Sequence, residues 1–397
     1  MRAGIITLML GYVLSQFYRA FLAVLTPVLE TDLGASKADL ATASGAWFLA
    51  FALMQIPVGE ALDRIGPRRT TAAALLVGAV GAALFAMAET PAMLSVAMAL
   101  IGVGCSPVLM ASFYIFARTF TPAVFGTLAG VTIGVGSLGN IAASLPLTLA
   151  VEGYGWRQTV WALAVVTALA GVVVAALVRD PVRVVATGQK GSVLTLLAMP
   201  ALWPIFAMMI VCYAPSAGLR GLWLGPYFTD VYGLDLPGVG RVSLWMGLAM
   251  VAGNFAYGPL DRWLGTRKWV VFGGNALMLA CLAALVAWPT GGAGLSILLF
   301  MGVGFFGASF PVVMGHGRAF LPPHLVGRGV AQINLCGIGA AGIMQMLTGR
   351  LHAALQPAEG IVNSAPPATP YLGLFVFYSL FVGVGLLIYL FSRDRTD

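Results

Sequence analysis

DRIGPRR at Asp63–Arg69 follows one long apolar run, and DRWLGTRK at Asp261–Lys268 follows another, 198 positions later. Three more pairs of segments repeat in the same order, at offsets of 200 to 203: Gly102–Gly104 with Gly302–Gly304, Arg118–Pro122 with Arg318–Pro322, and Gly134–Gly139 with Gly337–Gly342. Four ordered matches indicate an internal duplication. Duplicated membrane bundles are a common architecture of secondary carriers, so the repeat predicts two related halves.

The composition indicates a membrane protein. Of the 397 residues, 60% are hydrophobic and 9% are charged, and the mean hydropathy is +0.94. Soluble domains carry about 25% charged residues. The net charge of +7 comes from short loops between apolar runs, which indicates membrane topology and no nucleic-acid partner. The four cysteines lie in apolar segments without paired spacing, so no disulfide or metal site is predicted.

The apolar runs predict twelve membrane helices, because a spanning helix needs about 20 apolar residues. They lie near 5–29, 40–62, 70–88, 91–118, 125–150, 158–178, 200–228, 240–262, 269–288, 293–319, 326–351 and 371–391. The run after Arg2 is too long for a cleavable signal peptide and is expected to be the first helix. The predicted fold is an all-α membrane protein with two pseudo-symmetric six-helix bundles, 1–178 and 200–397. A basic linker at 179–199 joins them, and Gln356–Pro370 forms an outer loop.

The positive charges predict the orientation. With the N-terminus in the cytoplasm, fifteen basic residues lie on the inner side and four on the outer side. Cytoplasmic loops carry the excess of lysine and arginine in membrane proteins. We therefore expect both termini in the cytoplasm and the protein in a bacterial cytoplasmic membrane.

Two arginines remain that no loop accommodates. Arg19 lies 14 residues into the first predicted helix, about 21 Å along a path of roughly 30 Å. Arg220 lies 201 positions later, in the first helix of the second half. An arginine facing lipid costs about 2.5–3.5 kcal/mol and cannot escape by losing its proton. Each arginine either pairs with a carboxylate or helix-end carbonyls, or belongs to a cationic pair that binds an anion in a central cavity. We prefer the second interpretation, because the guanidinium fork fits carboxylate and phosphate oxygens.

Other polar side chains in the predicted spans are weaker candidates, since each is more often a helix–helix hydrogen bond than a ligand. Six join the candidate substrate site: Gln16, Tyr18, Tyr114, Asn140, Trp223 and Asn334. His316, near the predicted cytoplasmic end of its helix, is expected to have a gating or structural role. Met246 and Met250 share a helix face and are spaced as a copper(I) pair would be, although packing explains them more simply. The two G-x-G-x-x-G strings lack the strand of a dinucleotide site and predict close helix packing.

The whole chain resembles the major facilitator superfamily, in which twelve helices form two six-helix halves. Gly59–Arg69 is similar to the family's signature loop between helices 2 and 3, Asp261–Lys268 to its weaker copy between helices 8 and 9, and Gly155–Arg157 to a motif after helix 5. In that family the loop aspartate and arginines form a charge relay that holds the cytoplasmic side shut. The resemblance therefore implies gating roles for Asp63, Arg64, Gly66, Arg68, Arg69 and Arg118, and for Asp261, Arg262, Gly265, Arg267, Lys268 and Arg318.

The resemblance also implies a secondary active transporter that is not an enzyme and needs no cofactor. Arginines on helices 1 and 7 are similar to those of organophosphate–phosphate exchangers, and Gly136–Asn140 resembles the glycine-rich element of nitrate/nitrite porters. Those porters bind their anion with arginines on helices 2 and 8, where this chain has none at depth. We therefore expect a monomer in the lipid bilayer that moves a small organic anion by alternating access, as an exchanger or a proton symporter. The alternatives are a proton-coupled exporter of drugs or amphipathic metabolites and, less favoured, a copper importer.

Overall fold

The computed structural model is helical throughout the residues that it describes, which are 2–181, 196, 198–322, 326–356 and 368–395. Within them, ten helices are long and apolar enough to cross a membrane, and two bent pairs, counted as one span each, bring the total to twelve. The predicted all-α class and its twelve spans are confirmed. The chain separates into two compact units, 1–186 and 187–397. Most of the predicted linker at 179–199 and of the predicted outer loop Gln356–Pro370 lies outside the described residues.

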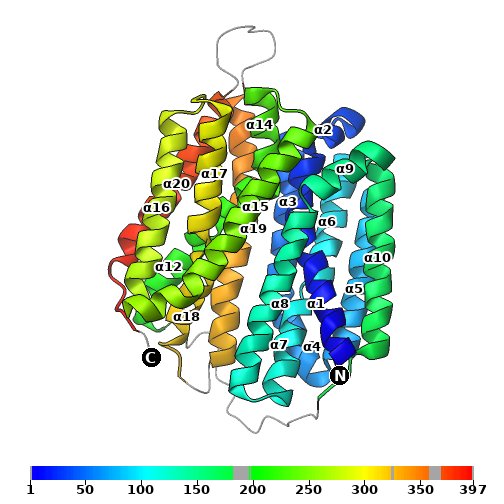
Figure 1. The fold of residues 1–397 in the computed structure, drawn as a ribbon, viewed down its shortest axis with the longest axis vertical. Helices are drawn as coiled ribbons and strands as arrows, with labels where there is room; N and C mark the ends of the chain where they lie inside the picture. Colours follow the sequence, from blue (N-terminus) through cyan, green and yellow to red (C-terminus); the bar gives the residue numbers. More distant parts are fainter. Residues whose placement is uncertain (1, 182–195, 197, 323–325, 357–367, 396–397) are drawn as a thin grey trace. The chain divides into compact units, whose positions relative to one another are not determined.

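The first half forms six spans from short and long helices (Figure 1). They are α1 (Arg2–Tyr18), α2 (Phe21–Leu33), α3 (Lys37–Leu53), α4 (Gln55–Arg64), α5 (Pro67–Ala86), α6 (Pro91–Cys105), α7 (Val108–Thr119), α8 (Pro122–Ala142), α9 (Leu145–Tyr154) and α10 (Trp156–Leu177).

The second half begins with an interrupted span and continues with longer helices. Its elements are η1 (Pro200–Leu202), α12 (Trp203–Cys212), α13 (Ala214–Gly218), the π-helical turn η2 (Leu219–Trp223), α14 (Leu224–Tyr232), α15 (Leu236–Leu264), α16 (Lys268–Ala287), α17 (Ala293–Phe306), η3 (Gly307–Ser309), α18 (Phe310–Arg318), α19 (Val326–Leu355) and α20 (Thr369–Tyr389).

The same helix pairs pack together in both halves. In the first half α1 packs on α8, α3 on α6, and α5 on both α6 and α10. In the second half the corresponding pairs are α12 with α19, α15 with α17, and α16 with both α17 and α20. The repeat in the sequence is therefore also a repeat of helix packing.

Glycines of the repeated segments lie where helices cross. A Cβ atom on Gly102 of α6 would collide with the carbonyl oxygen of Trp47 on α3, and one on Gly139 of α8 would collide with the carbonyl oxygen of Val13 on α1. Small residues allow membrane helices to approach to backbone contact. The Gly139 contact confirms the close packing that the first G-x-G-x-x-G string predicted.

Two spans that the sequence predicted as continuous are bent. The span at 125–150 bends by 41° between α8 and α9, where Pro146 removes a backbone donor and the Ser144 hydroxyl donates to the Ile141 carbonyl at 2.5 Å. The span at 5–29 bends by 46° between α1 and α2. Its break contains Arg19, and the Ala20 amide donates to the Phe17 carbonyl at 3.0 Å. The predicted depth of Arg19 thus coincides with an interruption of its helix.

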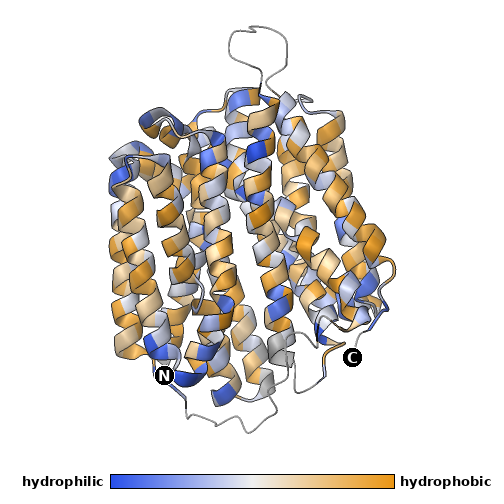
Figure 2. Ribbon diagram, turned by 180° about the vertical axis from the view of Figure 1, so that it is seen from behind, coloured by the Kyte–Doolittle hydropathy of each residue, from blue (hydrophilic) through white to orange (hydrophobic). Residues whose placement is uncertain are grey.

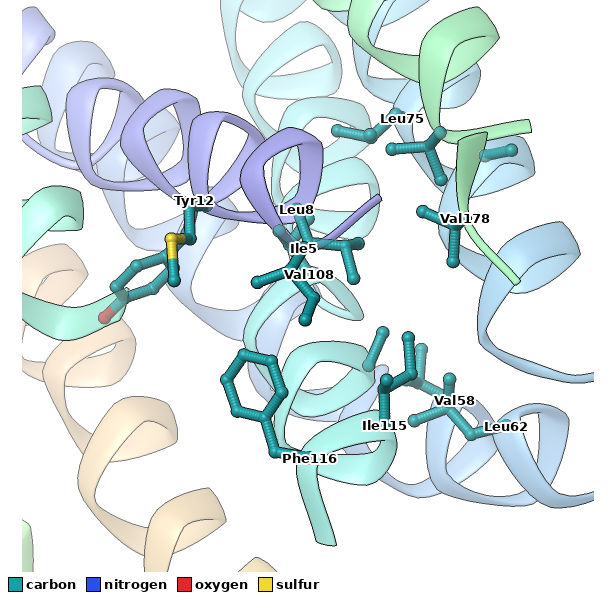
Figure 3. Packing of buried hydrophobic residues seen from close by; sticks show 14 residues of the cluster. Ile5, Leu8, Tyr12, Val58, Leu62, Leu75, Val108, Ile115, Phe116 and Val178 are labelled. Carbon is teal, nitrogen blue, oxygen red and sulfur yellow. The ribbon is translucent and has the colours of Figure 1, made fainter. Parts of the chain in front are cut away.

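Hydrophilic residues lie mainly toward the helix ends, and apolar residues cover the spans (Figure 2). A buried apolar cluster in the first half includes Ile5 and Leu8 of α1, Leu62 of α4 and Phe116 of α7 (Figure 3). Leu62 directly precedes the DRIGPRR loop. The cluster therefore fixes the base of that loop against two other helices.

Candidate functional site

Arg19 lies at the bend of the first span, against two aromatic rings of α3. Its guanidinium carbon is 5.2 Å from the ring centroid of Trp47 and 4.9 Å from that of Phe51. The two rings stack on each other at 5.1 Å with an interplanar angle of 18°. Arg19 is half-buried. Aromatic faces attract a cation electrostatically, so the pair restrains the guanidinium by its charge.

Arg220 lies in the π-helical turn η2 and is 2% exposed. Its guanidinium packs against Gly247 of α15, where an added Cβ would lie 2.7 Å from a guanidinium nitrogen. The absence of a side chain at Gly247 leaves the space that the guanidinium fills. Single π-helical turns inside longer helices occur frequently at functional sites. Both arginines of the predicted pair therefore lie at interruptions of the first span of their half.

The neighbours of the two arginines have different roles. The Tyr18 hydroxyl is 2.9 Å from the Thr167 hydroxyl of α10, so this ring joins α1 to α10. Gln16 donates to the Tyr12 hydroxyl at 3.0 Å. Trp223 follows Arg220 on the same π turn and is fully buried. Of the predicted neighbours, Trp223 also contacts a cluster of buried polar side chains on α19, which is described below.

The other predicted substrate residues lie on other helices. Asn140 on α8 and Asn334 on α19 are half-buried. Tyr114 on α7 lies beneath Arg118, whose guanidinium carbon is 3.9 Å from the ring centroid. Tyr114, predicted as a substrate residue, therefore contacts a predicted gating residue of the first half.

A polar cluster in the second half was not predicted as a site. Gln345, Thr348 and His352 lie three and four residues apart on α19 and are all buried. The Trp223 indole donates to the Thr348 hydroxyl at 3.0 Å, and its ring stacks on His352 with centroids 4.9 Å apart. This spacing along one helix face is the signal in the sequence that was available for finding the cluster. In the first half, the Trp47–Phe51 pair has the same i, i+4 signature.

The DRIGPRR loop is held by ion pairs and by a carboxylate that follows α10. Arg118 donates to Asp63 at 3.2 Å, and Arg64 pairs with Glu60 at 2.7 Å. The backbone amide of Arg68 donates to Asp180 at 2.7 Å, so this carboxylate accepts from the start of α5. Gly66 has a φ of 103°, and a Cβ there would lie 2.8 Å from the Asp180 carboxylate. Glycine is required at this turn on both counts.

The DRWLGTRK loop has a related but more local arrangement. Asp261 pairs with Arg267 of the same loop at 3.3 Å, whereas in the first half the aspartate pairs with another helix. Asp394, after α20, accepts from the Thr266 hydroxyl and from the backbone amides of Arg267 and Lys268, at 3.1 and 3.0 Å. The Lys268 ammonium donates to the Leu390 carbonyl at 2.7 Å. Gly265 ends α15 with a φ of 65°.

Asp394, which binds this loop from the segment after α20, has a lowered pKa. Partial burial acts to raise its pKa, but hydrogen bonds from Thr266 and from the amides of Lys268 and Arg267 outweigh burial and lower it. Most of the residues that the resemblance implied as gating residues are exposed, Arg118 and Arg318 among them. Asp180 and Asp394 were missed by sequence reasoning, since each lies after the last helix of its half and far along the chain from the loop it binds.

Two further sequence features have packing contacts. His316 is buried, with Nδ1 at 2.6 Å from the Tyr389 hydroxyl and Nε2 at 2.9 Å from the Arg393 carbonyl. Met246 and Met250 lie against Gly304 of α17. In the described part of the chain, His, Cys, Asp and Glu form no group of three that could hold a metal ion.

The motif Gly155–Arg157 anchors the start of α10. The Trp156 indole donates to Asp32 of α2 at 2.7 Å. The Arg157 guanidinium donates to the carbonyls of Ala86 and Ala88, at 3.0 and 2.9 Å. The motif therefore joins the same end of three spans of the first half.

Comparison with known proteins places these features in a family. A family model described as Major Facilitator Superfamily matches residues 8–346. Three solved structures share the fold. A bacterial homologue of the human lysosomal transporter Spinster, in an inward-facing and occupied conformation, is 15% identical, with a TM-score of 0.74 over 97% of this chain and 95% of that one. A mutant nucleoside transporter is 13% identical, with a TM-score of 0.78 over 98% and 99%. A D-xylose–proton symporter is 14% identical, with a TM-score of 0.74 over 98% of each chain.

A search of curated protein sequences found no significant match. At 13–15% identity, the structural likeness establishes the fold. It leaves the solute to be argued from the residues of this chain.

Proposed function

The protein belongs to the major facilitator superfamily of membrane secondary transporters, and we propose that its solute is a small organic anion. The family consists of transporters and not of enzymes. The proposal concerns the chemical class of the solute and the residues that bind it. Transport proceeds by alternating access, as exchange or as symport with a proton.

One observation carries the proposal: each half has an arginine at an interruption of its first span. Arg19 lies at the bend between α1 and α2, and Arg220 lies in the π turn before α14. A permanent cation at this depth is costly, and in membrane proteins such residues mark substrate or ion sites. Arginine in particular presents a planar fork that matches carboxylate and phosphate oxygens. The two cations therefore favour an anion as the solute.

The surroundings of Arg19 favour an organic anion over an inorganic one. The Trp47 and Phe51 rings beside the guanidinium are large apolar surfaces. An anion with a hydrocarbon or aromatic part gains from contact with such a surface, whereas nitrate or inorganic phosphate does not. A carboxylate or a phosphate ester satisfies both the arginine and its aromatic neighbours.

The two signature loops supply the proposed gates. The Asp63–Arg118 pair joins α4 to α7, and the side chain of Asp63 is 65% exposed. A surface ion pair of this kind contributes about 0–1 kcal/mol, so breaking it opposes a conformational change only weakly. We therefore assign the loops the role of latches, whose ion pairs form and break during each transport cycle.

The proposal is tested first by binding. Purified protein is heated with benzoate, succinate, glycerol 3-phosphate or nitrate, and the melting temperature is recorded. An anion that binds the folded state stabilises it by about 2.7 kcal/mol at a concentration of 100 Kd. We expect one of the three organic anions to raise the melting temperature more than nitrate does. A lipophilic cation that stabilises the protein in place of any anion would instead support the exporter alternative.

Transport then tests the two arginines. Uptake of the stabilising anion into proteoliposomes is compared for wild type, Arg19→Gln, Arg220→Gln and the control Arg241→Gln, which removes an exposed arginine from α15. Losing a hydrogen bond to a charged group costs about 1.5–3 kcal/mol, so roughly 10-fold or more of affinity is expected to be lost in either test variant. Wild-type uptake by both test variants contradicts the proposal.

A further inference from the structure

A row of buried polar and aromatic side chains runs along one face of α19 in the second half. Thr348 and His352 are one helical turn apart and 0% and 1% exposed. Trp223 contacts both, with its indole nitrogen on Thr348 at 3.0 Å and its ring stacked on His352 at 4.9 Å and 28°. Trp223 lies on the same π turn as Arg220. The histidine is therefore connected, through one tryptophan, to the segment that holds the buried arginine.

His352 also contacts a tyrosine that is bonded to a carboxylate. Tyr371 of α20 packs edge-on against the imidazole, with centroids 4.9 Å apart. Its hydroxyl donates to Asp230 of α14 at 2.5 Å. Asp230 lies two residues before the end of α14, at the end of the bundle that the charge distribution predicts to be the outer one. The imidazole thus contacts an indole and a phenol that is bonded to an acid, and these two rings also contact each other, with centroids 6.4 Å apart.

These contacts suit a histidine that gains and loses a proton. Histidine is the side chain whose charge changes between pH 5 and pH 8. Its protonated form is attracted by a tryptophan face, and more strongly when water is excluded. The negative charge of Asp230, one side chain away, acts in the same direction. The charged groups that act against protonation are Arg220 on η2 and Arg350 on α19 itself.

The other ionisable groups of the described spans are less suited to this task. Every carboxylate there lies within four residues of a helix end, and the acids of the signature loops are paired with arginines. His316 is bonded through both ring nitrogens at the opposite end of the second half. Burial of His352 disfavours the imidazolium, and the Trp223 face and the nearby Asp230 charge act against that penalty.

We propose that His352 binds the proton that is transported together with the anion. The inference rests on the proposed function, because an anion at Arg220 offsets the positive charge that opposes protonation of His352. The proton comes from water at the outer side, binds an imidazole nitrogen, and returns to water at the inner side after the solute leaves. Binding linkage is reciprocal, so protonation strengthens anion binding by the factor by which the anion strengthens protonation.

The first experiment measures the linkage. The Kd of the stabilising anion is determined from pH 5 to pH 9 for wild type, His352→Gln and the control Arg241→Gln, which changes an exposed residue of α15. In wild type and in the control, we expect the Kd to rise toward tenfold per pH unit on the alkaline side, as linked uptake of one proton requires. In His352→Gln the Kd is expected to be independent of pH. A wild-type pH dependence in His352→Gln overturns the proposal.

The second experiment separates coupling from transport. Proteoliposomes with an imposed pH gradient report accumulation of the anion, and proteoliposomes without a gradient report exchange of labelled for unlabelled anion. His352→Gln is expected to exchange without accumulating, whereas Arg241→Gln does both. If His352→Gln does not fold, His352→Phe keeps a ring on Trp223 and serves the same test. Accumulation by either variant at the wild-type level contradicts the proposal.

A third readout does not need the anion. Protonation of an imidazole stacked on an indole quenches the indole's fluorescence, so wild type is expected to show a step in tryptophan emission as the pH falls. The step should be absent from His352→Gln and from Trp223→Phe. If no anion binds but the step is present, the proposed function fails while proton binding at His352 stands. If an anion binds and no step is seen, the inference about His352 fails alone.

Discussion

The two halves hold their buried arginines in different ways, although the arginines are repeated 201 positions apart in the sequence. Arg19 is half-buried at a bend and lies against the faces of Trp47 and Phe51. Arg220 is 2% exposed, in a π-helical turn, and fills a space left by Gly247. A duplicated residue has therefore acquired two different environments.

The difference predicts different contributions to binding. A cation over an aromatic face is attracted over a broad range of positions, so the Arg19 contact fixes charge more than orientation. A buried slot fixes the plane of the guanidinium and therefore the direction of its donors. We expect Arg19 to attract the anion and Arg220 to orient it.

Lysine substitutions test this comparison with the largest expected effect. Lysine keeps the positive charge but loses the planar fork. Arg220→Lys is expected to weaken anion binding roughly tenfold or more, because the oriented donors are lost. Arg19→Lys is expected to stay within about threefold of wild type, because an ammonium is also attracted by the ring faces. Kd values from thermal-shift titrations check both. Equal losses in the two variants would show that the two sites act alike.

The glycine beneath Arg220 gives the second test. A Cβ at Gly247 would meet the end of the Arg220 side chain, which can move, and not a backbone atom. Gly247→Ala is therefore expected to displace Arg220 and weaken anion binding about fivefold, with a small change in melting temperature. The control is Gly258→Ala on the same helix, where an added Cβ meets nothing within 4 Å. A large loss of stability without loss of affinity would show that Gly247 serves packing alone.

The sequence predicted the helices and the pair of arginines, but not what surrounds them. Apolar run length and charge placement are local signals, and they located all twelve spans. The bend at Arg19 and the π turn at Arg220 are set by packing between helices, which no periodicity records. Trp47 and Gly247 lie on other spans, and their positions in the sequence do not show that they contact the arginines.

For the gating residues too, the sequence predicted some of the residues but not all of their contacts. The resemblance implied gating roles for Asp63 and Arg118, and in the structure these two side chains form an ion pair at 3.2 Å. It implied a matching role for Arg318, which stays a prediction, and in this loop Asp261 pairs with Arg267. The carboxylates that bind the loop amides, Asp180 and Asp394, lie more than 100 residues from the amides they accept from. Long-range hydrogen bonds of this kind leave no pattern in a single sequence.

Asp180 and Asp394 provide the smallest expected effect and compare the two loops directly. Each accepts backbone amides at the start of a helix, where a negative charge is favourable. Asp394 also binds the Thr266 hydroxyl, and its hydrogen bonds lower its pKa despite partial burial. Because Asp394 is largely exposed, we expect Asp394→Asn to reduce the melting temperature at pH 7 by only about 1–2 °C.

The pH dependence identifies the source of this contribution. A carboxylate whose pKa is lowered in the folded state stabilises the protein above its unfolded pKa of about 3.9, and the contribution is lost as the pH falls through the folded pKa. The difference in melting temperature between wild type and Asp394→Asn should therefore be full at pH 7 and shrink progressively below about pH 4. Asp180→Asn is the matched variant in the first half. A difference at pH 3 as large as that at pH 7 would show that the side chain acts through its shape and not through its charge.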